Sequence, residues 1–156
     1  LNNILRNLVD LTNRGFEKYP TDIFLVQSHG DFQPANILAG HDRNWLIDWE
    51  YTGVRQVAYD GLVFGLESRF PQGLSQRIEI ALSGDSAVDD IMMGWPFVEW
   101  RKGKRLSIIL LFLMEEMLLR VWQNTNPVFN NLDSGFIIFS PFSYYFAQLL
   151  LILVGS

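Results

Sequence analysis

The sequence predicts an α+β protein that is mainly helical, with one small β-hairpin in its first third. Apolar residues recur at helical spacing at the start of the chain and over long stretches after residue 57. Two β-prone runs, 37–39 and 45–49, flank a polar turn of hairpin length at 40–44. The apolar fraction of 49% is sufficient for a hydrophobic core.

The residues before the hairpin predict one helix and one strand. Apolar residues at positions 1, 4, 5, 8 and 9 share one face, so residues 1–12 are expected to form an amphipathic helix. Gly15 and Pro20 mark the loop that follows it. Residues 22–27 are largely apolar and are expected to be extended and buried.

The rest of the chain is expected to be mostly helical. Pro71 and the polar run 83–86 are predicted to end two of the helices. Residues 89–100 are expected to be irregular because Gly94 and Pro96 interrupt them. The last helix in this group is apolar on nearly all sides and is expected to lie centrally. The predicted helices span residues 57–70, 74–82 and 105–123.

Composition excludes several classes of protein. The net charge of −5 argues against nucleic-acid binding, which needs clustered Lys and Arg. The absence of cysteine excludes disulfides and thiolate metal sites, and it fits a cytoplasmic location. No signal peptide is visible after Leu1, and a start without Met suggests a piece of a longer protein.

The end of the chain resembles a membrane span, because residues 134–156 carry no charge. Pro141 would interrupt a helix there. The remaining helix, 142–154, would be about 20 Å long, whereas the apolar core of a bilayer is about 30 Å thick. We therefore expect a buried terminal helix, or one covered by sequence outside this chain, rather than a membrane span.

One short motif carries the chemistry. His29, Asp31 and Asn36 have the spacing of a protein-kinase catalytic loop, and Asp48 follows twelve residues after Asn36, where kinases place a metal-binding Asp. Phosphoryl transfer needs a carboxylate to orient the attacking hydroxyl and accept its proton, a task that suits Asp31. It also needs oxygen ligands for Mg²⁺, which Asn36 and Asp48 can supply across a hairpin.

The runs HGDFQPANIL and WLIDWEYTG resemble the signature of the aminoglycoside phosphotransferase and choline kinase family, which has a kinase-like fold. The resemblance covers about residues 26–60. Gly30 stands where protein kinases carry Arg, and Trp49-Glu50 where they carry Phe-Gly. The resemblance implies transfer of the γ-phosphate of ATP or GTP to a hydroxyl of a small molecule, such as an aminoglycoside, choline or a similar alcohol, with Mg²⁺ as cofactor.

The same resemblance implies roles for single residues. Asp31 would be the catalytic base, and Asn36 and Asp48 the Mg²⁺ ligands. Taken alone, Asp31 and Asn36 are also ordinary turn residues. Asp48, by contrast, lies in an apolar run where a carboxylate is costly unless it has a partner.

Three further residues are expected to support the loop. His29 would brace it, and Asp60 would hold it by accepting hydrogen bonds from its backbone. Glu50 follows the metal-binding Asp, as it does in many family members. The alternative for Asp60 is an ordinary cap of the helix that follows.

A kinase also needs a Gly-rich loop and a Lys that cover the phosphates. The 28 residues before His29 contain one Gly, Gly15, and one Lys, Lys18, in no phosphate-binding pattern. Residues 1–156 are therefore expected to form only the C-terminal lobe of a kinase-like phosphotransferase, without the nucleotide-binding lobe. Such a piece is expected to bind ATP poorly and to transfer no phosphate by itself.

The acceptor pocket in this family follows the metal-binding Asp, and acidic and aromatic side chains there suit a cationic amine. The alternative is a solvated acidic surface with Trp in the core. At least one of Glu115 and Glu116, on the most apolar helix, is expected to face the interior or the pocket. The candidate acceptor-binding residues are Glu67, Asp89, Asp90 and Trp95.

Two other functions stay open at this point. The first is a degenerate kinase-fold binding or regulatory protein without turnover, against which the complete set of Asp31, Asn36 and Asp48 argues. The second is a metal-dependent hydrolase built on His29 and Asp31. It is poorly supported because His41 is the only other histidine available as a ligand.

Overall fold

The fold comes from a computed structural model, which describes residues 2–84 and 86–125. Its helices are α1 (Asn2–Lys18), α2 (Tyr59–Gly65), α3 (Leu74–Ser83), α4 (Ala87–Met93) and α5 (Lys104–Thr125). Its strands are β1 (Leu25–Ser28), β2 (Ile37–Ala39), β3 (Asn44–Leu46) and β4 (Gly53–Gln56), with 3₁₀ turns η1 (Pro34–Asn36) and η2 (Trp49–Tyr51). The predicted α+β, mainly helical class is confirmed.

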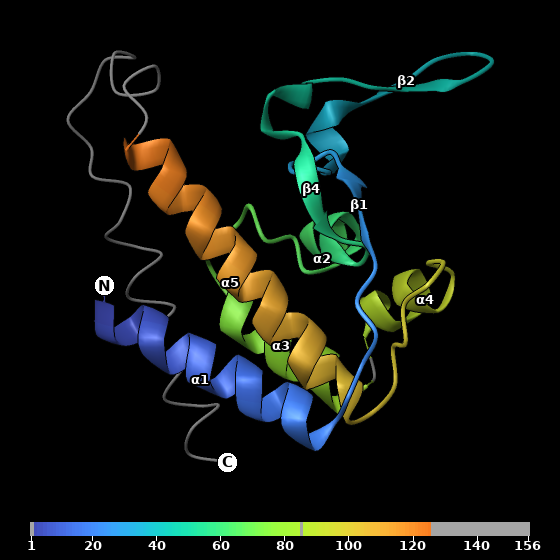
Figure 1. Ribbon diagram of the computed structural model, residues 1–156. Helices are drawn as coiled ribbons and strands as arrows, with labels where there is room; N and C mark the ends of the chain where they lie inside the picture. The colour runs from blue at the N-terminus through green and yellow to red at the C-terminus, as the bar shows by residue number, and fades with distance from the viewer. Residues whose placement is uncertain (1, 85, 126–156) are drawn as a thin grey trace.

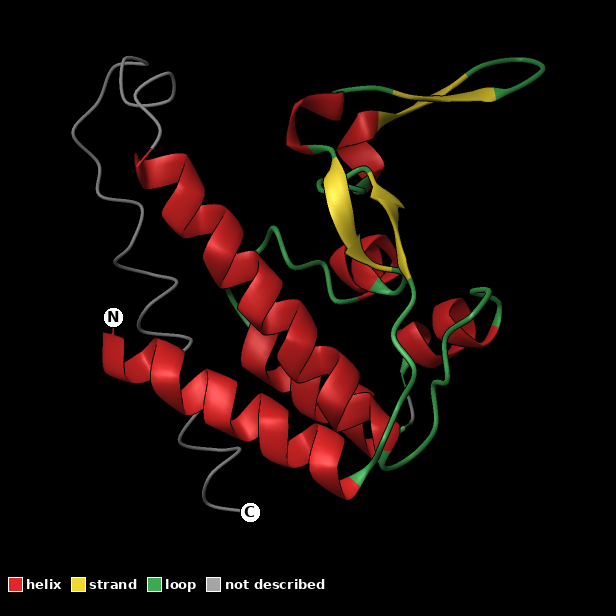
Figure 2. Cartoon of the chain, in the orientation of Figure 1, coloured by secondary structure: helices red, strands yellow, loops and turns green. Residues whose placement is uncertain are grey.

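The strands form two separate antiparallel pairs (Figure 2). β2 and β3 make the predicted hairpin, which projects away from the helical body (Figure 1). β1 pairs with β4 from Leu25↔Gln56 at one end to Ser28↔Gly53 at the other. β4 packs against α5 and leads into α2, while the loop that follows Ser28 continues through η1 into the hairpin.

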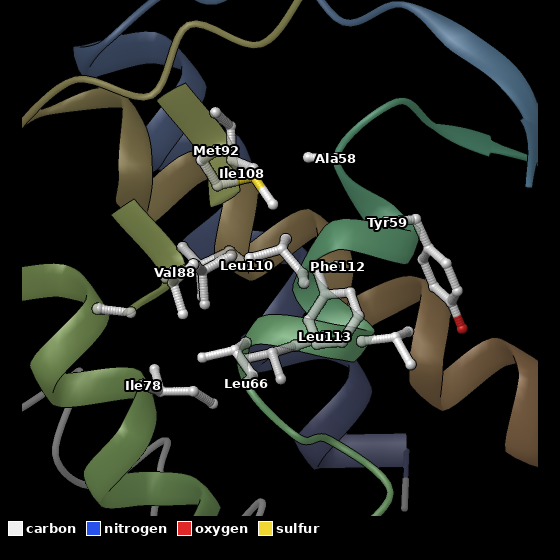
Figure 3. Packing of buried hydrophobic residues seen from close by; sticks show 14 of the residues in the cluster. Ala58, Tyr59, Leu66, Ile78, Val88, Met92, Ile108, Leu110, Phe112 and Leu113 are labelled. Carbon is white, nitrogen blue, oxygen red and sulfur yellow. The ribbon is translucent and has the colours of Figure 1, made fainter. Parts of the chain in front are cut away.

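The helices build one hydrophobic core. α1 packs along α5, and α2 packs against α4 and α5. Figure 3 shows side chains from α2, α3, α4 and α5 meeting in this core, with Phe112 and Leu113 of α5 among them. Both side chains are almost completely buried, which confirms the expectation that α5 is central.

The first helix extends past the predicted break at Gly15. A Cβ at Gly15 would lie 3.0 Å from the hydroxyl oxygen of Ser107 on α5. Gly15 therefore permits the close approach of α1 to α5, and packing between the helices outweighs its poor helix propensity. The glycine marks a helix contact and not a loop.

Two other differences concern strands. β4 was not expected, because Arg55 and Gln56 interrupt any apolar pattern after Gly53. β1 is extended as predicted but is not buried: Leu25 is 65% exposed. A two-stranded ribbon has two faces, and the first three residues of β1 are exposed while Ser28 is buried.

Helix α2 is shorter than predicted and α4 is more regular. After α2 the chain turns, and its carbonyl oxygens at Leu66, Glu67, Phe70 and Gln72 accept hydrogen bonds from the guanidinium of Arg77. Helix α4 begins with a capping box in which Ser86 and Asp89 bond each other's backbone amides. That cap explains why residues 89–93 are helical, whereas residues 94–100, with Gly94 and Pro96, are irregular as predicted.

None of the helices within residues 2–84 and 86–125 combines the length and the apolar character needed to span a bilayer. The predicted terminal helix at 142–154 lies outside the described residues.

Candidate functional site

The motif loop starts with a backbone turn that only glycine fits. Gly30, directly after β1 and His29, has φ +85°, a conformation that side chains disfavour. A Cβ at this position would also collide with the carbonyl oxygen of Tyr51 in η2. The loop and η2, which are far apart in sequence, therefore touch at Gly30.

Asp60 holds the backbone of this turn. It lies in the first turn of α2, and its two carboxylate oxygens accept hydrogen bonds from the amides of His29 at 2.7 Å and Gly30 at 2.9 Å. These are the contacts that the motif assigns to Asp60. That they serve catalysis stays a prediction.

His29 links the loop to the segment that carries Asp48. Its Nδ1 accepts the backbone N–H of Asp31 at 3.2 Å, so the proton resides on Nε2, which donates to the carbonyl oxygen of Ile47 at 2.8 Å. The ring also meets the edge of Trp49, with centroids 4.7 Å apart. Both ring nitrogens are occupied by backbone groups, which is the geometry of a bracing residue.

Asp31 is buried, with 8% of its surface exposed, and its carboxylate accepts several hydrogen bonds. Gln33 Nε2 donates to Oδ2 at 2.8 Å, Asn36 Nδ2 to the same oxygen at 2.9 Å, and Arg69 Nε to Oδ1 at 2.5 Å. Burial alone raises the pKa of Asp31, but Arg69 and the two amides outweigh it, so the pKa lies below its usual value. The carboxylate is thus ionised and fixed in orientation.

Asn36 and Asp48 lie at the two ends of the hairpin. The N–H of Ile47, next to Asp48, donates to the carbonyl oxygen of Asn36 at 3.0 Å and closes the hairpin ladder. Asp48 itself is exposed and adopts a left-handed conformation, with φ 66°. The run around Asp48 is apolar in sequence but largely exposed, so the cost of burying a carboxylate gives no argument for a metal there.

Asn36 and Asp48 both carry oxygen donors of the kind that Mg²⁺ prefers. Asn36 uses its amide nitrogen on Asp31, which leaves its side-chain oxygen for a ligand, and Asp48 offers an exposed carboxylate. Mg²⁺ keeps several waters and needs few protein oxygens. In the described part of the chain, no three His, Cys, Asp or Glu side chains form a metal-binding cluster.

Arg69 contacts the motif loop and Glu116 pairs with Arg69, and the motif revealed neither residue. Arg69 Nη2 donates to the carbonyl oxygen of Gly30 at 2.5 Å, and Nη1 to Glu116 Oε2 at 2.6 Å. Glu116 also accepts a hydrogen bond from the hydroxyl of Tyr59. A carboxylate on the most apolar helix requires a buried partner. That requirement was the available signal for Arg69.

Trp95, one of the candidate acceptor residues, follows α4 and contacts the segment between β4 and α2. Trp95 donates its indole N–H to the carbonyl oxygen of Val57 at 2.7 Å, beside the Leu25↔Gln56 end of the β1–β4 ribbon. The motif loop leaves the opposite end, about 10 Å further along the strands. Trp95 also packs against Gly61, next to Asp60, and its role in binding an acceptor stays a prediction.

The other acceptor candidates are already engaged or exposed. Asp89 is buried, and its carboxylate bonds Ser86, Trp100 and Arg105. Asp90 and Glu67 are exposed, and Glu67 lies in the turn after α2. Their roles in binding an acceptor stay predictions.

Glu50 borders a pocket of about 370 Å³ between η2, β4 and α5. Burial, with a further contribution from a hydrogen bond to Glu50, raises the pKa of Tyr51 in this pocket to about 12. The pocket is lined by Glu50, Tyr51, Thr52, Val54, Arg55, Glu115, Leu118 and Leu119.

A stretch of 45 residues is 42% identical to protein LicA of Haemophilus influenzae; it covers 29% of this chain and 13% of that protein. Protein LicA of H. influenzae strain Rd (ATCC 51907, DSM 11121, KW20) is 38% identical over 45 residues, again 29% of this chain and 17% of the relative. The matched segment thus spans less than a fifth of either relative. No family model matches the chain, and no solved structure matches it.

Proposed function

We propose that the chain is the catalytic lobe of a kinase-like phosphotransferase that moves the γ-phosphate of ATP or GTP to a hydroxyl of a small molecule. The short similarity to protein LicA supports a choline-kinase-like stretch, and it gives no support to the aminoglycoside phosphotransferase part of the resemblance. We therefore place small amino alcohols such as choline first among the acceptors.

The observation that carries the proposal is the setting of Asp31. A carboxylate offers about four acceptor positions, and the side chains of Gln33, Asn36 and Arg69 occupy three of them. One position is left for the acceptor hydroxyl. Asp31 would orient that hydroxyl for in-line attack and take its proton as the new P–O bond forms.

The metal and the nucleotide complete the proposal. Asn36 and Asp48 would hold Mg²⁺, which when bound neutralises charge on the phosphates. Asp60 and His29 would keep the loop and the Asp48 segment in register through their backbone contacts. The sequence has no Gly-rich loop with a partner Lys, so a second lobe would have to cover the nucleotide.

The test uses the complete protein, with any residues that precede Leu1 in its gene. Consumption of ATP or GTP is measured over a panel of alcohols, with choline and ethanolamine first, and product is identified by ³¹P NMR. We expect turnover with one acceptor and a loss of roughly a thousandfold or more in kcat for Asp31→Asn. Glu79→Gln, an exposed change on α3, is the matched control.

Full activity of the Asp31→Asn variant would remove the base assignment. Saturable nucleotide or choline binding without turnover on any alcohol would instead indicate a kinase-fold binding protein.

A further inference from the structure

We propose that Arg69 is a positioning residue for Asp31 and that Glu116 anchors it for this task. This inference rests on the proposed phosphotransferase function. Arg69 would act through the carboxylate of Asp31 and the backbone of Gly30, both of which it holds.

The guanidinium of Arg69 joins three groups from different parts of the chain. Nε donates to Asp31 Oδ1 at 2.5 Å, Nη2 to the Gly30 carbonyl oxygen at 2.5 Å, and Nη1 to Glu116 Oε2 at 2.6 Å. A planar fork can serve three acceptors in fixed directions, whereas a Lys ammonium is a single point of charge. The geometry therefore requires Arg and not simply a cation.

The pairing is buried, which makes its geometry rigid. The side chain of Arg69 is 12% exposed and that of Glu116 only 2%. Burial by itself lowers the pKa of Arg69. The charge of Glu116 and the neighbouring groups raise the pKa by more than burial lowers it, so the guanidinium stays charged. Tyr59, which is fully buried, donates its hydroxyl to Glu116 and fixes that carboxylate from the other side.

The network also directs the free acceptor position of Asp31. Arg69 fixes Oδ1, while Gln33 and Asn36 fix Oδ2. Without Arg69 the carboxylate can rotate about its χ2 bond, because the two amides hold only one of its oxygens. The acceptor hydroxyl would then meet a carboxylate in several orientations, and misplacement by about 1 Å costs roughly a hundredfold in rate.

The chain contains a matched control for this pairing. Arg105 forms an ion pair with Asp89 at 2.6 Å, with side chains 15% and 10% exposed. Within residues 2–84 and 86–125, no hydrogen bond or ion pair joins Arg105 to the motif loop. Removing Arg69 or Arg105 leaves a buried carboxylate without its cation in both cases. Differences between the two variants therefore report the link to Asp31 and not the general cost of losing a buried ion pair.

The kinetic test compares Arg69→Met, Arg69→Lys and Arg105→Met in the complete protein at a temperature where all are folded by circular dichroism. We expect kcat to fall roughly a hundredfold for Arg69→Met and about tenfold for Arg69→Lys, with KM for nucleotide changed less than about threefold. Arg105→Met is expected to lower the melting temperature and to keep kcat. Equal kcat values for Arg69→Met and Arg105→Met would overturn the proposal.

A second measurement is independent of phosphate transfer. The side-chain amide of Asn36 donates to the backbone oxygen and to Oδ2 of Asp31, so its ¹H–¹⁵N resonances report the position of that carboxylate. We expect these resonances, assigned by their loss in Asn36→Asp, to shift or broaden in Arg69→Met and not in Arg105→Met. Unchanged resonances in Arg69→Met would refute the positioning role. Shifted resonances in a protein without turnover would refute only the proposed function.

Discussion

Glu115 and Glu116 are neighbours on α5, but their carboxylates serve two different regions of the molecule. Glu115 accepts the backbone N–H of Gln56 at 3.0 Å and its side-chain amide at 3.1 Å, and so holds the end of β4. Glu116 accepts the guanidinium of Arg69 and the hydroxyl of Tyr59, and so reaches the motif loop. Glu115 accepts these hydrogen bonds from the neutral Gln56, whereas Glu116 accepts one of its hydrogen bonds from a guanidinium.

The different partners of Glu115 and Glu116 change the electrostatic environment of each carboxylate. Burial raises the pKa of Glu115, and the two N–H donors of Gln56 and the charge of Arg55 offset this only in part. Glu116 is buried more deeply but is paired with a charged guanidinium. One helix can thus hold a strand with one carboxylate and pair with Arg69 through the next, because successive residues point in directions about 100° apart.

The largest expected effect is that of Glu116→Ala. This variant leaves Arg69 with Asp31 as its remaining carboxylate, so we expect the free energy of unfolding to fall by about 3 kcal/mol or more. Urea unfolding followed by circular dichroism measures this value, with Glu79→Ala as the exposed control. If Glu116→Ala lowered the free energy of unfolding no more than Glu79→Ala does, the ion pair between Glu116 and Arg69 would contribute nothing measurable to stability.

Tyr59→Phe removes one donor from Glu116 and keeps the ion pair with Arg69. Hydrogen bonds to charged groups are worth about 2 kcal/mol, and we expect that loss in unfolding free energy. The ring still packs on Phe112, with centroids 5.4 Å apart, so the change isolates the hydroxyl. Additive losses in Tyr59→Phe/Glu116→Ala would contradict a shared network, since the second change removes the partner of the first.

The smallest expected effect is a change in pH dependence caused by Glu115→Gln. Because the pKa of Glu115 is raised above 4.5 in the folded state, its contribution to stability is full below about pH 4.5 and is lost as pH rises through the folded pKa. Unfolding free energies between pH 4.5 and 8 should therefore decline less in Glu115→Gln than in the parent. Parallel curves would mean that Glu115 titrates normally.

The sequence pattern predicted the elements whose signal is local. The hairpin 37–39/44–46 and the helix that became α5 were visible because turn residues and apolar periodicity lie within the elements themselves. β4 was missed because Arg55 and Gln56 are polar on the surface of a narrow ribbon. The helix boundary at Gly65 was missed. Directly after it, the carbonyl oxygen of Leu66 accepts a hydrogen bond from Arg77, which lies eleven residues further along the chain.

The site divides in the same way. His29, Asp31, Asn36 and Asp48 could be found because their spacing is a motif within twenty residues of chain. Arg69 and Glu116 could not be found that way. The contact between Arg69 and Glu116 spans 47 residues of sequence, and the contact between Arg69 and Asp31 spans 38. Long-range ion pairs leave no periodicity in a sequence; they leave only a charged residue in an apolar setting.

The contact between Gly30 and Tyr51 restricts how this chain can change by mutation. Any side chain at position 30 meets the Tyr51 carbonyl oxygen, and Arg55 Nη2 holds that oxygen in place at 2.9 Å. A single-step replacement of Gly30 by the Arg that protein kinases carry is therefore blocked until η2 moves. Because η2 begins directly after Asp48, such a move would also shift the proposed metal ligand. The loop at Gly30 and the segment that carries Asp48 are therefore coupled in evolution. A mutation in one of them limits which mutations the other can accept without loss of the fold.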